Sequence, residues 1–235
     1  MRIFVAGATG VIGRILVPLL VTAGYEVTGM TRSTERATAV TAVGAEPAVV
    51  DVFDGAALTA TVIAARPDVV IHQLTDLTTP PGQGLSDVEL VRNARLREEG
   101  TANLVAAVVA AEAGRLVAQS VAWLYADGPE PHAEDDPLLA AEGPYSTPTR
   151  RAVYELERLV TTDTRFEGIV LRYGRFYGPG TWSETPQEPP TVHVEAAAVA
   201  ALLAVARGEA GVYNVVDDGG PVSNDKARSV LGWSP

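Results

Sequence analysis

The feature that most constrains the fold is a set of three glycines close to the N-terminus. Gly7, Gly10 and Gly13 follow a short apolar run and precede an amphipathic segment with helical periodicity. A strand that turns through glycines into a helix leaves backbone N–H groups open, and a pyrophosphate binds there without meeting a Cβ atom. The G-x-x-G-x-x-G spacing is one residue longer than the common dinucleotide fingerprint, and a purely structural turn would also use glycine. The coincidence of strand, glycines and helix favours a dinucleotide site.

The rest of the chain alternates short β-branched runs with longer helical stretches. This order predicts a doubly wound, Rossmann-type α/β fold with a mostly parallel sheet. We expect strands near residues 2–6, 26–30, 46–50, 68–72, 115–120, 167–172 and 212–216, and helices near 11–23, 33–43, 55–65, 87–113, 148–162 and 194–207. Residues 1–175 are assigned to a dinucleotide-binding domain, and residues 176–235 to a small substrate-binding region packed on it.

Composition excludes several classes of function. Asp and Glu outnumber Lys and Arg by 29 to 18, so the net charge of −11 argues against a nucleic-acid partner. There is no cysteine, and the three histidines form no H-x-x-x-H pair, so no metal site is expected. No secretory signal and no apolar stretch of about 18 residues is found, which predicts a cytoplasmic protein without a membrane partner.

The end of the second strand indicates which dinucleotide is preferred. An acidic residue here would bind the adenosine 2′-hydroxyl and repel a 2′-phosphate, but the sequence has Arg32 between two hydroxyl residues. This favours NADP(H), with NAD(H) as the alternative. A solvated Arg32 beside a Ser33 that only caps a helix is the competing interpretation.

Further motifs extend over almost the whole chain. They are Asp51-Val52, the G-T-A-N-L run at 100–104, the L-R-Y-G-R-F-Y-G-P-G run at 171–180, V-H-V-E at 192–195 and L-G-W-S-P at 231–235. Together with the glycine motif they resemble the NAD-dependent epimerase/dehydratase group of the extended and atypical short-chain dehydrogenase/reductase superfamily. The expected cofactor contacts, in part implied by this resemblance, are Gly7, Thr9, Gly10, Val11, Ile12, Gly13, Arg32, Asp51, Val52, Gln73, Leu74 and Tyr173.

The resemblance implies a catalytic Ser and a Tyr followed four residues later by Lys. Ser120 occupies the place of the Ser, although a structural strand-end hydroxyl would look the same, and Tyr145 is the natural counterpart of the Tyr. The single lysine of the chain is Lys226, so no Tyr-Lys pair exists.

Two registers remain open at this point. Tyr145 is followed four residues later by Thr149, whereas a register set by the following helix puts Thr147 and Arg151 at the two positions. Arg151, or its neighbour Arg150, could supply the missing positive charge, but a guanidinium stays protonated and does not relay a proton. The expected catalytic set is Ser120, Tyr145 and Arg151; a role of both arginines in capping and solvating the helix is the alternative.

Arg175 and Tyr177 are the candidate substrate contacts. Arg175 replaces the Asn of the family pattern, where it could bind an anionic or carbonyl-bearing group or pair with the acidic run 134–136. Only 12 residues separate Gly180 from His193, which indicates a small substrate. We therefore expect an NADP(H)-dependent oxidoreductase of the carbonyl reductase or isomerase type, acting on a small metabolite as a homodimer. A dinucleotide-binding sensor without turnover and a non-redox cyclase or lyase are the alternatives.

Overall fold

A sheet of seven parallel strands forms the centre of the molecule, in the order β3-β2-β1-β4-β5-β6-β9. The computed structural model describes residues 1–77, 86–143 and 147–235. The strands are β1 (Arg2–Ala6), β2 (Glu26–Thr31), β3 (Glu46–Val49), β4 (Val69–His72), β5 (Arg115–Val121), β6 (Glu167–Tyr173) and β9 (Gly211–Val215). This is the Rossmann-type fold that the alternation of segments predicted.

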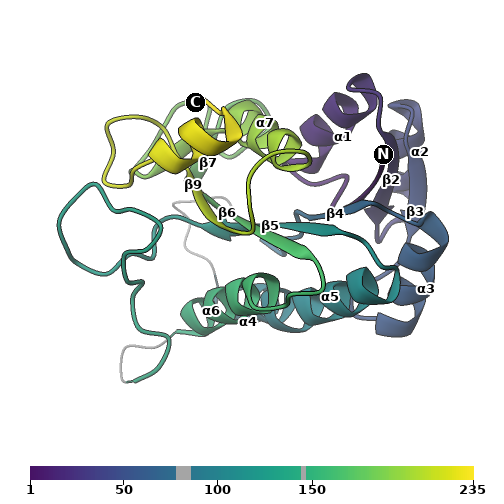
Figure 1. The fold of residues 1–235 in the computed structure, drawn as a ribbon, viewed down its shortest axis with the longest axis horizontal. Helices are drawn as coiled ribbons and strands as arrows, with labels where there is room; N and C mark the ends of the chain where they lie inside the picture. Colours follow the sequence, from purple (N-terminus) through teal and green to yellow (C-terminus); the bar gives the residue numbers. More distant parts are fainter. Residues whose placement is uncertain (78–85, 144–146) are drawn as a thin grey trace.

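Helices cover both faces of this sheet, as Figure 1 shows. On one face lie α1 (Gly13–Thr22), α2 (Thr34–Ala42) and α7 (Val194–Ala204). On the other lie α3 (Gly55–Ala65), α4 (Asp87–Arg95), α5 (Thr101–Ala110) and α6 (Pro148–Thr161). Because both faces are covered, strands such as β4 are buried at every position.

The order of the strands determines where a ligand can bind. From β1 the chain winds outward through β2 and β3, and then returns so that β4 pairs with the other side of β1. In open sheets of this kind, ligands bind beyond the carboxyl ends of the strands at such a reversal. The glycine motif directly follows β1 and therefore lies at that point.

The predicted strands and helices are all present, with one division and two additions. The helix expected over 87–113 is interrupted between α4 and α5 by a π-helical turn at Leu96–Gly100. Two three-residue strands, β7 (Arg175–Tyr177) and β8 (Thr191–His193), pair in parallel outside the main sheet, and a second π-helical turn spans Ala227–Leu231. Segments of three residues are too short to show a periodicity. The domain boundary at residue 175 stays a prediction.

The apolar stripes of α5 and α6 are buried within the chain itself, so they do not by themselves indicate a dimer contact. Leu104, Val108, Val153 and Leu156 face the sheet and are at most 1% exposed. The homodimer therefore stays a prediction. Within the described ranges, no helix combines the length and apolar character needed to cross a membrane.

Candidate functional site

The loop after β1 has the geometry of a phosphate cradle. Gly7 has φ +93°, and a Cβ atom there would lie 2.8 Å from the carbonyl oxygen of Gln73. At Gly13 a Cβ atom would lie 2.1 Å from the Gly7 carbonyl oxygen, so helix α1 starts directly against the loop. Among the described residues no side chain caps α1 at Ile12, so no side-chain acceptor occupies the helix N-terminus, where an anion binds favourably.

A pocket of about 320 Å³ opens beside this loop. Seven of the expected cofactor contacts line it, namely Gly7, Thr9, Gly10, Arg32, Val52, Gln73 and Leu74. The others, Val11, Ile12, Gly13, Asp51 and Tyr173, lie outside its lining. The Asp51 carboxylate instead accepts a hydrogen bond of 2.9 Å from the backbone N–H of Phe53. The residues present therefore suit a bound dinucleotide along the glycine loop and the end of β2.

Two arginines stand at the end of the pocket where β2 leads into α2. Arg32 is more than half exposed and lies 3.9 Å from the Asp76 carboxylate, which also pairs with Arg92 at 3.3 Å. Arg36, which the sequence reading did not single out, lines the same wall. Ser33 accepts a hydrogen bond from the Arg36 backbone N–H and so caps α2, which is the structural role given above as the alternative for this residue.

At the opposite end of the pocket, the residues after β4 are held in place by a buried histidine. The Leu74 backbone N–H donates to Nδ1 of His72 at 3.2 Å, and Nε2 lies 3.1 Å from the Thr101 hydroxyl. Burial, and secondarily the Arg97 guanidinium, lowers the pKa of His72 to about 4, so the ring is neutral at physiological pH. The proton then resides on Nε2, because Nδ1 accepts. His72 is a structural residue that positions the Gln73-Leu74 backbone.

A set of polar side chains lies beside these residues. Gln73 Nε2 is 3.5 Å from the hydroxyl of Tyr173, and Gln119 donates to the Leu74 carbonyl at 2.8 Å. Burial raises the pKa of Tyr173, so its hydroxyl stays protonated. Gln73 Oε1 is buried and has no hydrogen-bond partner within the described part of the chain. Gln73 lines the pocket, and an unpaired buried acceptor there fits a ligand that brings a donor, as a carboxamide does.

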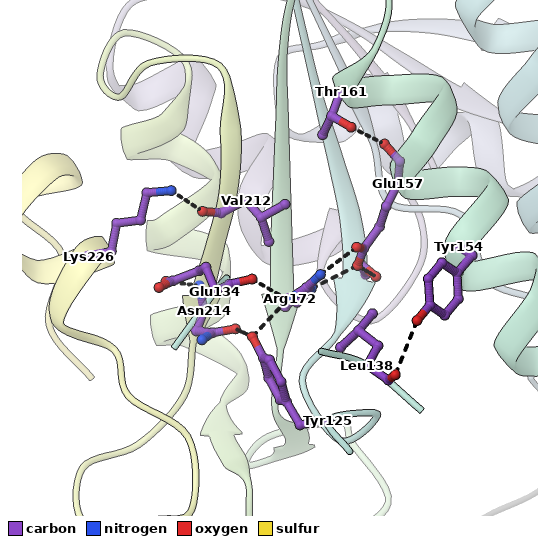
Figure 2. Close-up of polar contacts among 11 residues, drawn as sticks. Tyr125, Glu134, Leu138, Tyr154, Glu157, Thr161, Arg172, Val212, Asn214 and Lys226 are labelled. Carbon is purple, nitrogen blue, oxygen red and sulfur yellow. Dashed lines mark hydrogen bonds and ion pairs between the residues drawn. The ribbon is translucent and has the colours of Figure 1, made fainter. Parts of the chain in front are cut away.

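Ser120 belongs to a buried charged network, part of which is drawn in Figure 2. Its hydroxyl donates to Glu157 of α6 at 2.6 Å, and Glu157 also binds Arg172 of β6 through two bonds of 2.9 and 2.7 Å. Ser120 pairs with Arg172 and Arg172 with Asn214 in the strand register, so the three lie in one row across the sheet. The Ser120 hydroxyl thus has an anionic acceptor inside the protein.

The network continues from Arg172 toward the edge of the sheet. Arg172 donates to the Tyr125 hydroxyl at 2.8 Å, and Tyr125 donates to Asn214 at 2.7 Å. The Glu134 carboxylate accepts the Asn214 backbone N–H at 2.7 Å, while its carbonyl accepts from Arg172. This network holds the segment after β5 against β6 and β9.

The other members of the expected catalytic set have different surroundings. Tyr145 lies outside the described residues. Thr147 caps α6 by accepting the Arg150 backbone N–H at 3.2 Å, and Arg151 lies on the exposed side of the helix. A second buried arginine, Arg97, lies on the π-helical turn. Burial lowers the pKa of its guanidinium to about 10, although the negative charge of Glu157 raises it. A pattern of apolar residues could not reveal that a charged residue points inward here.

Arg175 and Tyr177 lie in β7 above the carboxyl ends of the main strands. The Arg175 guanidinium donates to the carbonyls of Glu188 and Pro189 at 3.1 Å and lies 3.6 Å from the Glu188 carboxylate. Its partner is thus Glu188 and not the acidic run 134–136. The Tyr177 ring meets that of His193 edge-on, and burial and the neighbouring Asp217 raise the pKa of Tyr177.

A doubly wound sheet, a glycine cradle and an arginine-edged pocket beside it are typical of a dinucleotide-binding protein. The sequence model described as the NAD-dependent epimerase/dehydratase family matches residues 3–214, and the chain belongs to that family. This confirms the family and the class of NAD(P)-dependent, short-chain dehydrogenase/reductase-like enzyme expected from the motifs. It also supports a nicotinamide dinucleotide without distinguishing NADP from NAD.

Known proteins extend the comparison. The chain is 48% identical over 187 residues to a 3-diazoavenalumate denitrifying reductase of a Streptomyces species, covering 77% of this chain and 58% of that protein. The fold is similar to UDP-glucose 4-epimerase of Thermotoga maritima with a TM-score of 0.80 and 19% identity, covering 100% and 94% of the two chains. It is also similar to the UDP-glucose 4-epimerase of Thermus thermophilus, with a TM-score of 0.75 and 23% identity, covering 100% of this chain and 85% of that chain.

Proposed function

We propose that the protein is an NADP(H)-dependent reductase that acts on a small carboxylate substrate carrying a diazonium group. The observation that carries the proposal is the 48% identity to a relative whose name describes a denitrifying reductase of a diazo carboxylate. The chain spans 58% of that relative, so its reaction is carried over as a hypothesis. The glycine cradle and the orphaned Gln73 acceptor support the cofactor part.

The bound dinucleotide supplies hydride. In the proposed reaction a carbon–nitrogen bond of a diazonium carboxylate breaks, a carbon–hydrogen bond forms, and dinitrogen leaves. The two electrons come from NADPH, which becomes NADP⁺, and no proton is taken up. A carbonyl substrate, in contrast, needs a proton on oxygen. Lys226 is the only lysine, and it binds the Val212 carbonyl at 2.7 Å on β9. A reaction without proton transfer suits a chain that has no Tyr-Lys pair.

The preference for NADP(H) rests on the charge at the end of β2. Arg32 and Arg36 line the pocket there, and their guanidinium groups suit a 2′-phosphate. Replacing Arg32 or Arg36 with Ala should weaken NADPH binding by about 1.5 to 3 kcal/mol and leave NADH binding nearly unchanged. Arg165→Ala, which removes an equal charge on the surface, is the matched control. Equal calorimetric affinity of the intact protein for NADPH and NADH would contradict the preference.

Catalytic variants separate the two substrate classes. Tyr145, Ser120 and Arg151 stay the proposed catalytic residues for a carbonyl substrate, where Tyr145→Phe should lower turnover by about two to four orders of magnitude. With a diazotised aminocinnamate, Tyr145→Phe should leave the rate of NADPH oxidation nearly unchanged, because no proton is transferred. Protein that binds NADPH but oxidises it with neither substrate would favour the sensor instead.

A further inference from the structure

Trp123 is the residue beyond the expected site that most needs an explanation. It follows β5 and is 36% exposed, although an indole side chain gains more than most from burial. Arg175 lies over its ring, with the guanidinium carbon 5.4 Å from the ring centroid. The Arg175 side chain is itself 38% exposed. Part of an indole and part of a guanidinium are therefore both accessible at one place.

The strand register puts this pair at the candidate site. Val121 at the end of β5 pairs with Tyr173 at the end of β6, and the Ala122 N–H donates to the Tyr173 carbonyl at 2.9 Å. Trp123 and Arg175 each lie two residues beyond the paired strand ends. Both therefore stand over the carboxyl edge of the sheet, where ligands of this fold bind. The hydroxyl of Tyr173, at the end of β6, contacts Gln73, which lines the cofactor pocket.

The surroundings of Arg175 show which part of it is available. One guanidinium nitrogen is engaged by the carbonyls of Glu188 and Pro189, which orient the group. The other faces the Glu188 carboxylate at 3.6 Å, longer than a charge-assisted hydrogen bond, and the Glu188 side chain is 83% exposed. A carboxylate that accepts two charge-assisted hydrogen bonds of ordinary length from the guanidinium would bind Arg175 better than Glu188 does. The exposed pair with Glu188 is therefore weak enough for another carboxylate to compete with it.

We propose that Trp123 and Arg175 form a subsite for a planar aromatic carboxylate, whose ring stacks on the indole while its carboxylate displaces Glu188 from Arg175. This subsite rests on the proposed function in that it names the substrate class of the reductase. Indole faces suit flat conjugated rings, and a guanidinium binds a carboxylate through two parallel bonds. Trp123 therefore selects shape, and Arg175 selects charge.

Calorimetric titration with cinnamate, cinnamamide and cyclohexanepropionate tests the subsite on the full chain, with and without NADP⁺. Cinnamate should bind about tenfold more tightly than either of the other two. Trp123→Leu should remove the preference for the flat ring, and Arg175→Gln the preference for the charge. Trp182→Leu, which removes another half-exposed tryptophan, is the matched control and should bind as the intact protein does.

Glu188→Gln provides a variant in which the backbone contacts of Arg175 remain. It should raise the affinity for cinnamate several-fold and leave that for cinnamamide unchanged. Unchanged cinnamate binding by Trp123→Leu, or loss of binding by Trp182→Leu alone, would overturn the subsite. These titrations require no turnover. Cinnamate binding without NADPH oxidation would contradict the reductase and support the subsite. Oxidation of NADPH by diazotised aminocinnamate at the same rate in the intact protein and in Trp123→Leu would support the reductase and contradict the subsite.

Discussion

Removing the charge of Glu157 should destabilise the protein more than any single surface change. Its side chain is 10% exposed and that of Arg172 is 6% exposed, with two hydrogen bonds between them. Glu157→Gln preserves the shape of the side chain and an acceptor for Ser120, but it leaves Arg172 as a buried charge with only neutral partners. Breaking a buried pair from one side costs about 3 to 5 kcal/mol. For a chain of this size the melting temperature should fall by about 10 °C.

Urea unfolding followed by tryptophan fluorescence measures this loss. Glu155→Gln on the same helix is the matched control, since Glu155 and Arg158 form an exposed pair that contributes less than about 1 kcal/mol. Replacing both partners, as in Glu157→Leu with Arg172→Met, should recover part of the stability because the buried Arg172 charge is removed together with its partner, while the buried Arg97 charge remains. A Glu157→Gln variant that is no less stable than Glu155→Gln would show that the buried pair of Glu157 and Arg172 does not stabilise the fold.

Three further predictions concern other parts of the molecule. The pKa of His72 is lowered to about 4, against about 6.5 in the unfolded chain, so the unfolded state binds more protons between these values. In urea unfolding, the free energy of unfolding should fall by up to about 3 kcal/mol as the pH drops from about 6.5 to 4. The fall should be smaller in the His72→Gln variant. Gly7→Ala should lower calorimetric NADPH affinity more than tenfold (~1.4 kcal/mol) through strain and the contact with the Gln73 carbonyl, whereas Gly24→Ala, with a similar φ and open space, should not. We expect a homodimer that uses the exposed Val91 on α4, so light scattering should give a monomer for Val91→Glu, and a monomeric intact protein would contradict this.

Local patterns were sufficient to predict the sheet, its helices and the glycine cradle. Gly7 and Gly13 could be interpreted because one backbone conformation and one close approach require glycine at those positions. The helix expected over 87–113 showed no sign of its π-helical turn, since that turn changes the hydrogen bonding and leaves the composition unchanged.

The polar contacts of the site depend on pairs that are distant in sequence. Ser120 and Glu157 are separated by 37 residues, and the sequence contains no signal that the carboxylate would turn inward to meet the hydroxyl. Trp123 and Arg175 meet only because β5 and β6 are neighbours in the sheet. Such contacts become visible once the strand register is known, because the register sets which side chains lie in one row.

The proposed reaction is tested most directly by one single-turnover experiment. Protein loaded with NADPH is mixed with a limiting amount of diazotised aminocinnamate, and NADPH, dinitrogen and cinnamate are counted, with a protein-free mixture as control. One NADPH should be oxidised for each dinitrogen released and each cinnamate formed. Dinitrogen release without loss of NADPH, or bound NADPH that persists while the diazonium stays intact, would contradict the proposed reaction.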